Sequence, residues 1–331
     1  MTIAVYGAGG IGCYVGGRLV AGGADVVFVG RQRVGDELAE HGLRLTDYLG
    51  ADLRVDGLRF ATTAAAVADA DLVLVTVKSA ATEGAADELA AVLKPGAVVV
   101  SFQNGVRNGE VLRERLPEQI VLSGMVPFNV LNKGGGAFHQ GTEGGLDVQE
   151  HAALTPYVEA FGKAGLPLTQ HADLLPVQWA KLLLNLNNPV NALSDLPLRD
   201  ELSQRGYRRC LAAAQEETLK LLQAKGIRPA RLTALPADRL PMVLRLPDFL
   251  FRRLASKMLA IDPHARSSMW EDLQAGRRTE IDYLNGEVVR LAESLDRTAP
   301  VNAKLVDLIR AEEAGPRRAW TGDELFKQLR M

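Results

Sequence analysis

Short apolar runs rich in β-branched residues alternate with stretches of helical periodicity from the start of the chain to about residue 172. This alternation predicts a mostly parallel sheet covered by helices on both faces, the arrangement of an α/β domain. The predicted strands are 2–6, 25–29, 42–46, 58–61, 71–77, 97–102, 120–126, 136–142 and 145–149. The predicted helices of this half are 10–21, 82–93, 107–115 and 151–164.

Helical periodicity replaces the strand pattern after about residue 173. The predicted helices are 173–193, 200–225, 238–259, 264–275, 279–295 and 301–313, with Gly226 as the C-cap of the second. The stretch from Pro229 to Pro247 predicts an irregular connection or a pair of short helices, since proline interrupts regular helix. We therefore expect two domains, an α/β domain over 1–172 and an all-helical domain over 173–331.

The first predicted strand runs directly into a glycine-rich turn. The residues of this turn are Gly7, Ala8, Gly9, Gly10, Ile11 and Gly12. A G-x-G-x-x-G sequence between a strand and a helix is typical of a Rossmann-like dinucleotide-binding domain, in which the helix N-terminus faces a pyrophosphate. The strand at 25–29 completes a strand–helix–strand unit of about 30 residues, the context in which the motif is informative. A glycine turn without a binding function is the alternative.

The residues that follow the second predicted strand distinguish NADP from NAD. Enzymes that bind NAD usually carry an acidic residue here, which holds the ribose 2′-hydroxyl. This chain has Gly30, Arg31, Gln32 and Arg33 instead, and a guanidinium binds a 2′-phosphate through paired, charge-assisted hydrogen bonds. We predict NADPH/NADP as the cofactor, with Arg31 as its primary contact; two solvated surface arginines are the alternative.

Two further polar residues follow predicted strands at the end where ligands bind. Lys78 follows the strand 71–77, and Asn104 follows the strand 97–102. Because an open parallel sheet binds its ligands beyond the carboxyl ends of the strands, we expect both residues to approach a bound nucleotide. An ordinary asparagine–glycine turn is the alternative for Asn104.

The predicted helix 173–193 carries a polar stripe among leucines. Lys181, Asn185 and Asn188 are spaced i, i+4 and i+7, which predicts that they project from one helix face. Asparagine is a poor helix former, so two of them here indicate either a function or a hydrogen-bonded network between helices. Further along, Thr279 is a candidate helix N-cap, with Glu280 in the first turn.

Composition and charge narrow the class of protein. The 331 residues are 47% hydrophobic, and the net charge of −2 gives no electrostatic case for binding nucleic acid or a membrane surface. The apolar runs are too short to span a bilayer, and the N-terminus lacks the features of a signal peptide. Two cysteines, Cys13 and Cys210, favour a reducing cytoplasm over a disulfide scaffold. The five histidines are scattered without ligand spacing, so we expect no metal site.

Several motifs, in the same order along roughly residues 1–310, together resemble the ketopantoate reductase (2-dehydropantoate 2-reductase) family. They are the glycine turn, Arg31, the strand end at Lys78, Gln-Asn104-Gly, Trp-x-Lys181-Leu-x-x-Asn185, Ser-Ser268-Met and Arg-x-Thr-Glu280-Ile-Asp-Tyr-Leu-Asn-Gly. The last two motifs are the most specific.

The resemblance implies NADPH-dependent reduction of 2-dehydropantoate to (R)-pantoate, a step toward pantothenate and coenzyme A. It implies that Lys181 is the general acid and that Glu280 lies near this lysine and the nicotinamide ribose. The other implied roles are substrate binding by Asn185, Asn188 and Ser268, cofactor binding by Arg31 and Lys78, and contact with both molecules by Asn104.

Two departures from the family pattern bear on which substrate fits. Asn188 stands seven residues after Lys181, one fewer than in the family, although it still precedes a proline. The segment from Pro229 to His264 is longer than in compact members. One alternative is a reductase of another small branched 2-keto acid. An alternative of another class is a non-catalytic NADP(H)-sensing protein. The sequence also leaves open whether the protein forms a homodimer.

Overall fold

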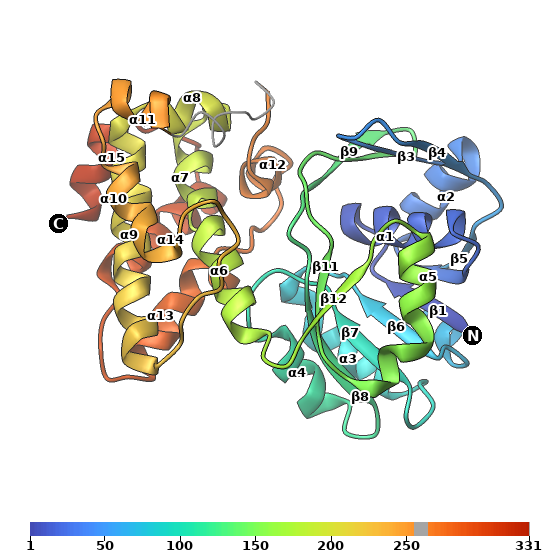
Figure 1. Cartoon of the computed structure of the whole chain (residues 1–331). Coiled ribbons are helices and arrows are strands. Elements are labelled where there is room, and N and C mark those ends of the chain that lie inside the picture. Colours follow the sequence, from blue (N-terminus) through green and yellow to red (C-terminus); the bar gives the residue numbers. More distant parts are fainter. Residues whose placement is uncertain (255–263, 331) are drawn as a thin grey trace. The chain divides into compact units, whose positions relative to one another are not determined.

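The structure is a computed structural model that describes residues 1–254 and 264–330 (Figure 1). The chain divides into two compact units, Met1–Leu174 and Leu175–Met331.

The first unit is built on an eight-stranded sheet with the strand order β12-β11-β8-β7-β6-β1-β2-β5 (Figure 1). The strands are β1 (Thr2–Tyr6), β2 (Asp25–Val29), β5 (Arg59–Ala61), β6 (Leu72–Val75), β7 (Val98–Ser101), β8 (Ile120–Met125), β11 (Leu146–Gln149) and β12 (Leu168–His171). The six strands from β5 to β8 are parallel neighbours, whereas β11 is antiparallel to β8. The chain passes from β1 to β2 and β5 and then returns to β6 on the other side. This makes β1 and β6 the switch point at which doubly wound sheets bind ligands.

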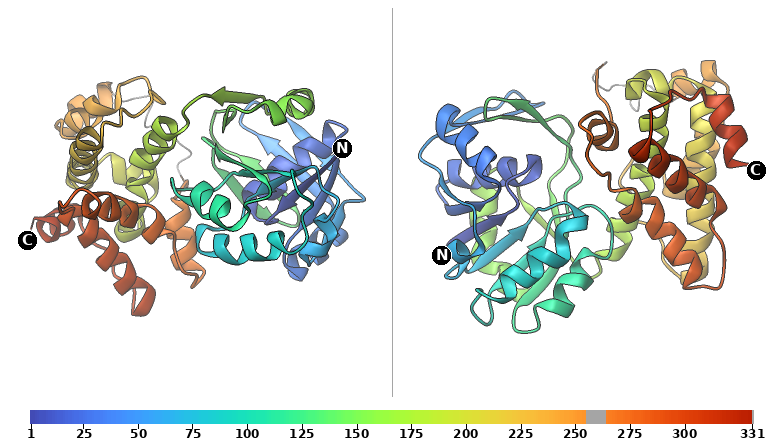
Figure 2. Two further views of the ribbon diagram at one scale, coloured as in Figure 1. Left: turned by 90° about the horizontal axis from the view of Figure 1, so that it is seen from below. Right: turned by 180° about the vertical axis from the view of Figure 1, so that it is seen from behind.

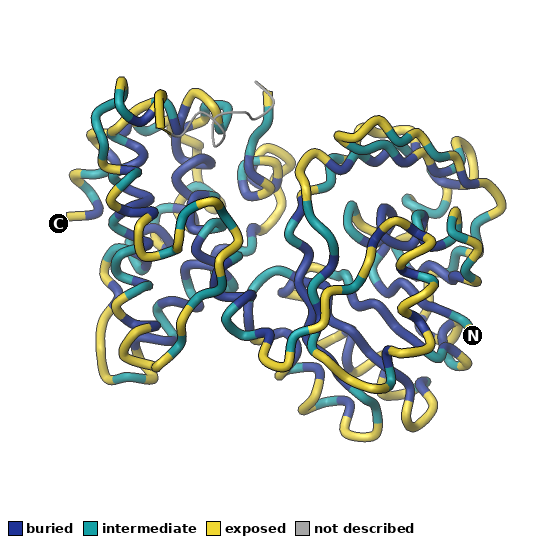
Figure 3. The backbone as a smooth tube through the Cα atoms, viewed as in Figure 1, coloured by how far each residue is buried: buried dark blue, intermediate teal, exposed yellow. Residues whose placement is uncertain are grey.

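Both faces of this sheet are buried. Successive residues of a strand point to opposite faces, so each strand contributes side chains to two hydrophobic cores. Ile3 and Val5 of β1 join one hydrophobic core, to which α1 (Gly10–Ala21) and α5 (Val158–Lys163) contribute. Ala4 and Tyr6 join a second core, to which α3 (Thr82–Ala90) and α4 (Asn108–Arg115) contribute. The buried strands appear as dark blue segments in Figure 3. Two-sided burial explains why β6 and the first three residues of β7 are uninterrupted apolar runs in the sequence. The predicted α/β class is confirmed.

The predicted strands 42–46 and 136–142 belong to a separate sheet. They appear as β3 (Leu43–Asp47) and β10 (Ala137–Gln140), which pair in parallel between β4 (Asp52–Val55) and β9 (Val130–Gly134). Helix α1 contacts all four strands, so this sheet covers the helix that follows the glycine turn. The sequence pattern missed β4, β9 and β12, whose residues are mostly exposed or half-buried. It also missed α2 (Gln32–His41), in which Leu38 is the buried residue.

The second unit is built from helices. They are α6 (Leu175–Asn185), α7 (Asn187–Ser194), α8 (Leu198–Leu202), α9 (Arg205–Lys225), α10 (Leu240–Leu244), α11 (Asp248–Leu254), α12 (Ser268–Gln274), α13 (Asn285–Glu293), α14 (Pro300–Ala314) and α15 (Gly322–Leu329). The long helix α9 packs against α7, α8, α10, α13, α14 and α15 (Figure 2). Gly226 caps α9 with a φ of 79°, as predicted. None of the helices described is long and apolar enough to cross a membrane.

The single helix predicted over 173–193 is wrong, because the chain forms two helices separated at Leu186. The cause is Pro189, which has no N–H to donate to the carbonyl of Asn185 and whose ring would clash with it. The last α6 hydrogen bond is therefore from Leu186 N–H to Leu182 O, at 3.0 Å. Asn188 lies on α7, so the prediction of one shared helix face does not extend to it.

Other predicted helices are also divided. The stretch 200–225 forms α8 and α9, and 238–254 forms a 3₁₀ turn followed by α10 and α11. The remainder of the predicted helix 238–259 lies outside the described residues. The pattern missed α15.

Candidate functional site

The glycine turn lies at the switch point of the large sheet. Gly7 and Ala8 N–H both donate to Val29 O, at 2.9 and 3.1 Å, and Gly9 N–H donates to Gly7 O at 2.7 Å. Gly7 has a φ of +115°, which side-chain-bearing residues rarely adopt. These bonds tighten the turn so that α1 begins at Gly10, directly beyond the end of β1.

The other two glycines of the motif face different surroundings. A Cβ atom at Gly12 would overlap Gly7 O and lie 2.7 Å from Thr76 Oγ1. A glycine at this position therefore allows α1 to pack closely against the ends of β1 and β6. A Cβ at Gly9 would have no atom of the protein within 4 Å. The N-terminus of α1 therefore has open space beside Gly9, where the first helical N–H groups lack partners within the helix. Those groups and the helix dipole suit an anion such as a pyrophosphate.

Arg31 stands at the carboxyl end of β2, next to the glycine turn. A Cβ at Gly30 would lie 2.6 Å from the Cβ of Ala8, so the residue before Arg31 touches the turn. Arg31 itself is exposed and precedes the first residue of α2. Its guanidinium is thus available to a ligand that extends from the turn past the end of β2.

The loops after β6 and β7 are joined by hydrogen bonds. Ser79 Oγ donates to Asn104 O at 3.2 Å, and Asn108 Nδ2 donates to the same oxygen at 2.6 Å. Lys78 is exposed and directly precedes Ser79. The structure therefore brings the backbone segments of Lys78 and Asn104 together beyond the carboxyl ends of β6 and β7, the edge at which doubly wound sheets bind ligands.

A buried glutamine supports the same two loops. Gln103 Nε2 donates to Val77 O at 3.0 Å and to Thr82 Oγ1 at 2.7 Å, while its Oε1 accepts from Ser101 Oγ at 2.9 Å. Sequence reasoning missed this network. The signal available was the run of polar residues that follows each apolar strand.

Lys181 lies on α6, one helical turn before Asn185, and both side chains are half-buried. Desolvation by burial lowers the pKa of Lys181 to about 8. A lysine with a pKa in this range can give up a proton near neutral pH, as a general acid must.

Asn188 is tied to the segment that carries Ser268. Ser267 Oγ donates to the carbonyl of Asn188 at 3.2 Å, and Ser267 N–H donates to Asn191 Oδ1 at 2.9 Å. Ser267 is also the N-cap of α12, where its Oγ accepts from Trp270 N–H. Ser268 follows as the exposed first residue of α12. Sequence reasoning missed Ser267 and Asn191, although a serine before a helix is an N-cap signal.

Glu280 is half-buried and precedes a short 3₁₀ turn, Ile281–Tyr283. Thr279 Oγ1 accepts from Ile281 N–H at 3.3 Å, and Thr279 N–H donates to Glu313 Oε1 of α14 at 2.8 Å. The predicted helix 279–295 is therefore this 3₁₀ turn followed by α13. The N-cap of the 3₁₀ turn is Glu280 and that of α13 is Leu284, so the prediction of Thr279 as a helix N-cap with Glu280 in the first turn is wrong.

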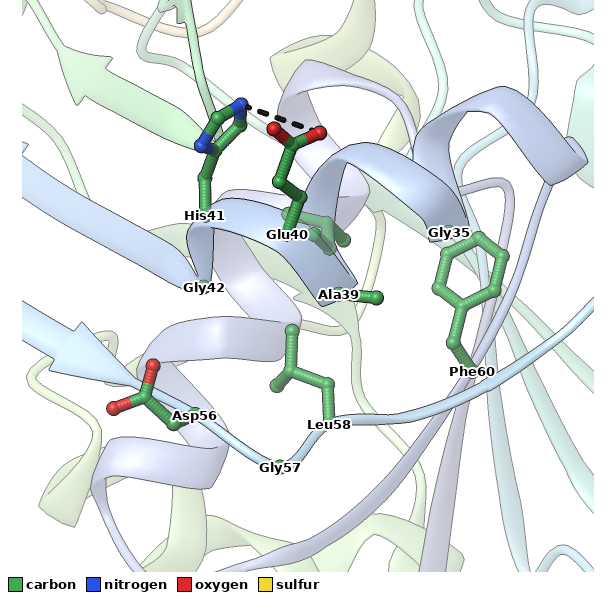
Figure 4. A pocket seen from close by; sticks show the side chains of 10 residues that line it. Gly35, Ala39, Glu40, His41, Gly42, Asp56, Gly57, Leu58 and Phe60 are labelled. Atoms are coloured by element: carbon green, nitrogen blue, oxygen red, sulfur yellow. Dashed lines mark ion pairs between the residues drawn. The ribbon is translucent and has the colours of Figure 1, made fainter.

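A hollow of about 440 Å³ lies between α2 and the segment that joins β4 to β5 (Figure 4). It is lined by Gly35, Leu38, Ala39, Glu40, His41, Gly42, Asp56, Gly57, Leu58 and Phe60. This hollow extends to the C-terminal end of α2, whereas Arg31 precedes the N-terminal end. None of the predicted site residues lines it.

The histidines, cysteines and carboxylates do not form a metal-binding cluster in the part of the chain that is described. No group of three or more His, Cys, Asp or Glu residues there could hold a metal ion. His171 pairs with Asp147 at 2.6 Å. Cys13 and Cys210 are buried free thiols, and burial raises the pKa of Cys13 to about 12. Burial therefore disfavours the reactive thiolate form of Cys13 at neutral pH.

Comparison with known proteins covers both units. The family model described as "Ketopantoate reductase PanE/ApbA" matches residues 3–153, and the model of its C-terminal part matches residues 173–313. A 2-dehydropantoate 2-reductase of Halobacterium salinarum is 32% identical over 320 residues, which cover 94% of this chain and 98% of that protein.

Two solved structures share the fold. A PanE/ApbA family ketopantoate reductase from Ralstonia eutropha JMP134 is 31% identical, with a TM-score of 0.81 over 95% of this chain and 99% of that one. A D-mandelate dehydrogenase, solved with NADH and anilino(oxo)acetate, is 19% identical, with a TM-score of 0.79 over 95% of this chain and 99% of that one. At that identity the second likeness concerns the fold alone.

Proposed function

We propose that this chain, which belongs to the ketopantoate reductase family, catalyses the NADPH-dependent reduction of 2-dehydropantoate to (R)-pantoate. It is an oxidoreductase that acts on a CH–OH group. The observation that carries the proposal is the half-buried lysine on α6, whose pKa is lowered to about 8. The reaction forms pantoate on the route to pantothenate and coenzyme A.

The cofactor residues belong to the first domain, which we take as 1–172. The space at Gly9 and the free N–H groups at the start of α1 fit a pyrophosphate. In this proposal the glycine turn from Gly7 to Gly12 holds the pyrophosphate, Arg31 binds the 2′-phosphate of NADPH, and Lys78 contacts the cofactor. Arg31 favours NADPH over NADH, because NADH lacks the 2′-phosphate with which the guanidinium forms an ion pair.

The catalytic residues belong to the helical domain, which we take as 173–331. Bound NADPH supplies the hydride that adds to the carbonyl carbon. Lys181 Nζ gives its proton to the ketone oxygen, which would otherwise carry the negative charge that develops there. Glu280 lies near the lysine and the nicotinamide ribose in this proposal, so its carboxylate favours the charged form of Lys181 before the transfer.

The remaining residues bind the substrate. Asn185, Asn188 and Ser268 carry the neutral hydrogen-bonding groups that suit a hydroxyl and a carboxylate. Asn104 contacts both substrate and cofactor. We also infer a cytoplasmic location, which the two free thiols support. A homodimer is a further proposal, tested by the mass of the purified protein in solution.

The test is NADPH oxidation measured with a panel of 2-keto acids that includes ketopantoate and 2-ketoisovalerate. We expect the highest kcat/KM with ketopantoate. A much higher kcat/KM with 2-ketoisovalerate would overturn the pathway assignment while keeping the reaction class.

The Lys181→Ala variant tests the role of the lysine. It should abolish reduction and leave NADPH binding, measured by fluorescence titration, largely intact. Survival of activity in this variant would show that the assignment of the general acid is wrong.

A further inference from the structure

A buried glutamate lies beside the two asparagines that flank Asn188. Glu201 of α8 is fully buried, and its Oε2 accepts a hydrogen bond of 2.9 Å from Asn187 Nδ2. Asn191, one helical turn after Asn187 on α7, lies near the same carboxyl, while its Nδ2 donates to Leu196 O at 2.9 Å. Residues i and i+4 share a helix face, so Glu201 holds the inner face of the first turn of α7.

Burial favours the neutral form of the Glu201 carboxyl. Desolvation raises its pKa to about 8, against the opposing effects of the two asparagines and of Arg208. The titratable and charged groups that face it from α9 are Tyr207, Arg208 and Cys210. The Arg208 guanidinium pairs with Asp248 at 2.9 Å and donates to three backbone carbonyls. These hydrogen bonds and this ion pair are made with groups other than the Glu201 carboxyl.

A protonated Glu201 carboxyl fits the hydrogen-bonding groups that surround it. Among the described residues, the acceptors Glu201 Oε1 and Asn187 Oδ1 are buried without a hydrogen-bond partner. Buried acceptors that lack a donor are costly, and a carboxylic acid supplies a donor that a carboxylate does not.

The cluster continues from Glu201 to the proposed substrate residues. Asn191 Oδ1 accepts from Ser267 N–H at 2.9 Å, and Ser267 Oγ donates to Asn188 O at 3.2 Å. Asn188 is thus held through Asn187 before it and through Ser267 at its carbonyl. The same bonds fix the residue that precedes Ser268.

We propose that Glu201 is a positioning residue, which holds the first turn of α7 and the start of α12 so that Asn188 and Ser268 bind the 2-keto acid. Glu201 acts through its hydrogen bond to Asn187 and its position beside Asn191, and it does not touch substrate. This inference rests on the proposed function.

The test compares Glu201→Ala and Glu201→Gln by steady-state kinetics at pH 7, with thermal unfolding of each variant. We expect Glu201→Ala to raise the KM for ketopantoate about tenfold, as for the loss of a buried hydrogen bond. The KM for NADPH should stay unchanged. Glu201→Gln should restore the low KM, because a neutral amide both donates and accepts.

Glu217→Gln is the matched control. Glu217 is another glutamate that holds a helix start, since it accepts from Val301 N–H, Asn302 N–H and Asn302 Nδ2 at 2.8–3.0 Å. We expect this variant to lower the unfolding temperature and to leave the KM for ketopantoate unchanged.

A pH series keeps the inference testable even where Glu201→Ala fails to fold. Above about pH 8, ionisation of Glu201 should raise the KM of the wild-type enzyme for ketopantoate, and Glu201→Gln should lack that rise.

Equal KM profiles of wild type and Glu201→Gln across this range would overturn the inference, as would a wild-type KM in a folded Glu201→Ala variant. The proposed function fails separately, through a wild-type enzyme that reduces no 2-keto acid.

Discussion

Ser267 and Asn188 are 79 positions apart in the chain, yet the hydroxyl of Ser267 donates a hydrogen bond of 3.2 Å to the backbone carbonyl of Asn188. The same hydroxyl accepts from Trp270 N–H and so caps α12. One side chain therefore stabilises a helix and joins two segments that the proposed function assigns to substrate binding.

Ser267→Ala removes both bonds. We expect a loss of stability of about 1 kcal/mol, typical of a lost N-cap, together with a several-fold rise in the KM for ketopantoate. Thr321→Ala is the control, because Thr321 caps α15 with no bond to the proposed site residues. It should lower the unfolding temperature alone. A rise in KM of the same size in both variants would attribute the effect to general destabilisation.

Substitutions at two glycines of the turn test its roles in folding and in cofactor binding separately. Gly12→Ala should lower the unfolding temperature, because its Cβ would overlap Gly7 O. Gly9→Ala should fold normally, since its Cβ meets open space, but should bind NADPH more weakly because the methyl group occupies the space of the pyrophosphate. Thermal unfolding and fluorescence titration measure the two effects. Unchanged NADPH affinity in Gly9→Ala would exclude this turn as the phosphate site.

Arg31→Ala should raise the KM for NADPH far more than the KM for NADH. A charge-assisted phosphate contact contributes roughly 1.5–3 kcal/mol, which corresponds to about 10- to 150-fold. Arg33→Ala, at an exposed neighbour on α2, is the matched control and should change neither value appreciably. Equal changes in KM for both cofactors would remove the 2′-phosphate role of Arg31.

Lys181 should impose a pH limit on the chemical step. Its pKa of about 8 means that the proton needed for reduction is lost as the pH rises through that value. We expect the single-turnover rate constant for ketopantoate reduction to be constant well below pH 8. Above that value it should fall about tenfold per pH unit. Pantoate oxidation needs the free amine, so its rate should rise over the same interval. A forward rate that is independent of pH would argue against Lys181 as the acid.

Local patterns accounted for the elements whose signals lie within a few residues. The glycine turn, the strand ends before Lys78 and Asn104, and the cap at Gly226 each depend on neighbouring residues, and the structure contains these elements where the sequence predicts them. Pro189 was a local signal too, and its missing N–H explains why the helix predicted across it is two helices.

The sequence by itself determined the α/β class, the helical second half and the nucleotide-binding motif, because periodicity and glycine geometry act over short distances. The tertiary structure alone decided that β3 and β10 form a separate sheet over α1. It alone decided that Asn187 donates to Glu201, and that Ser267 hydrogen-bonds to Asn188. Such pairings depend on which buried donors meet which acceptors after the helices pack. Contacts of this kind join residues that are far apart in the chain, so no repeating pattern in the sequence predicts them.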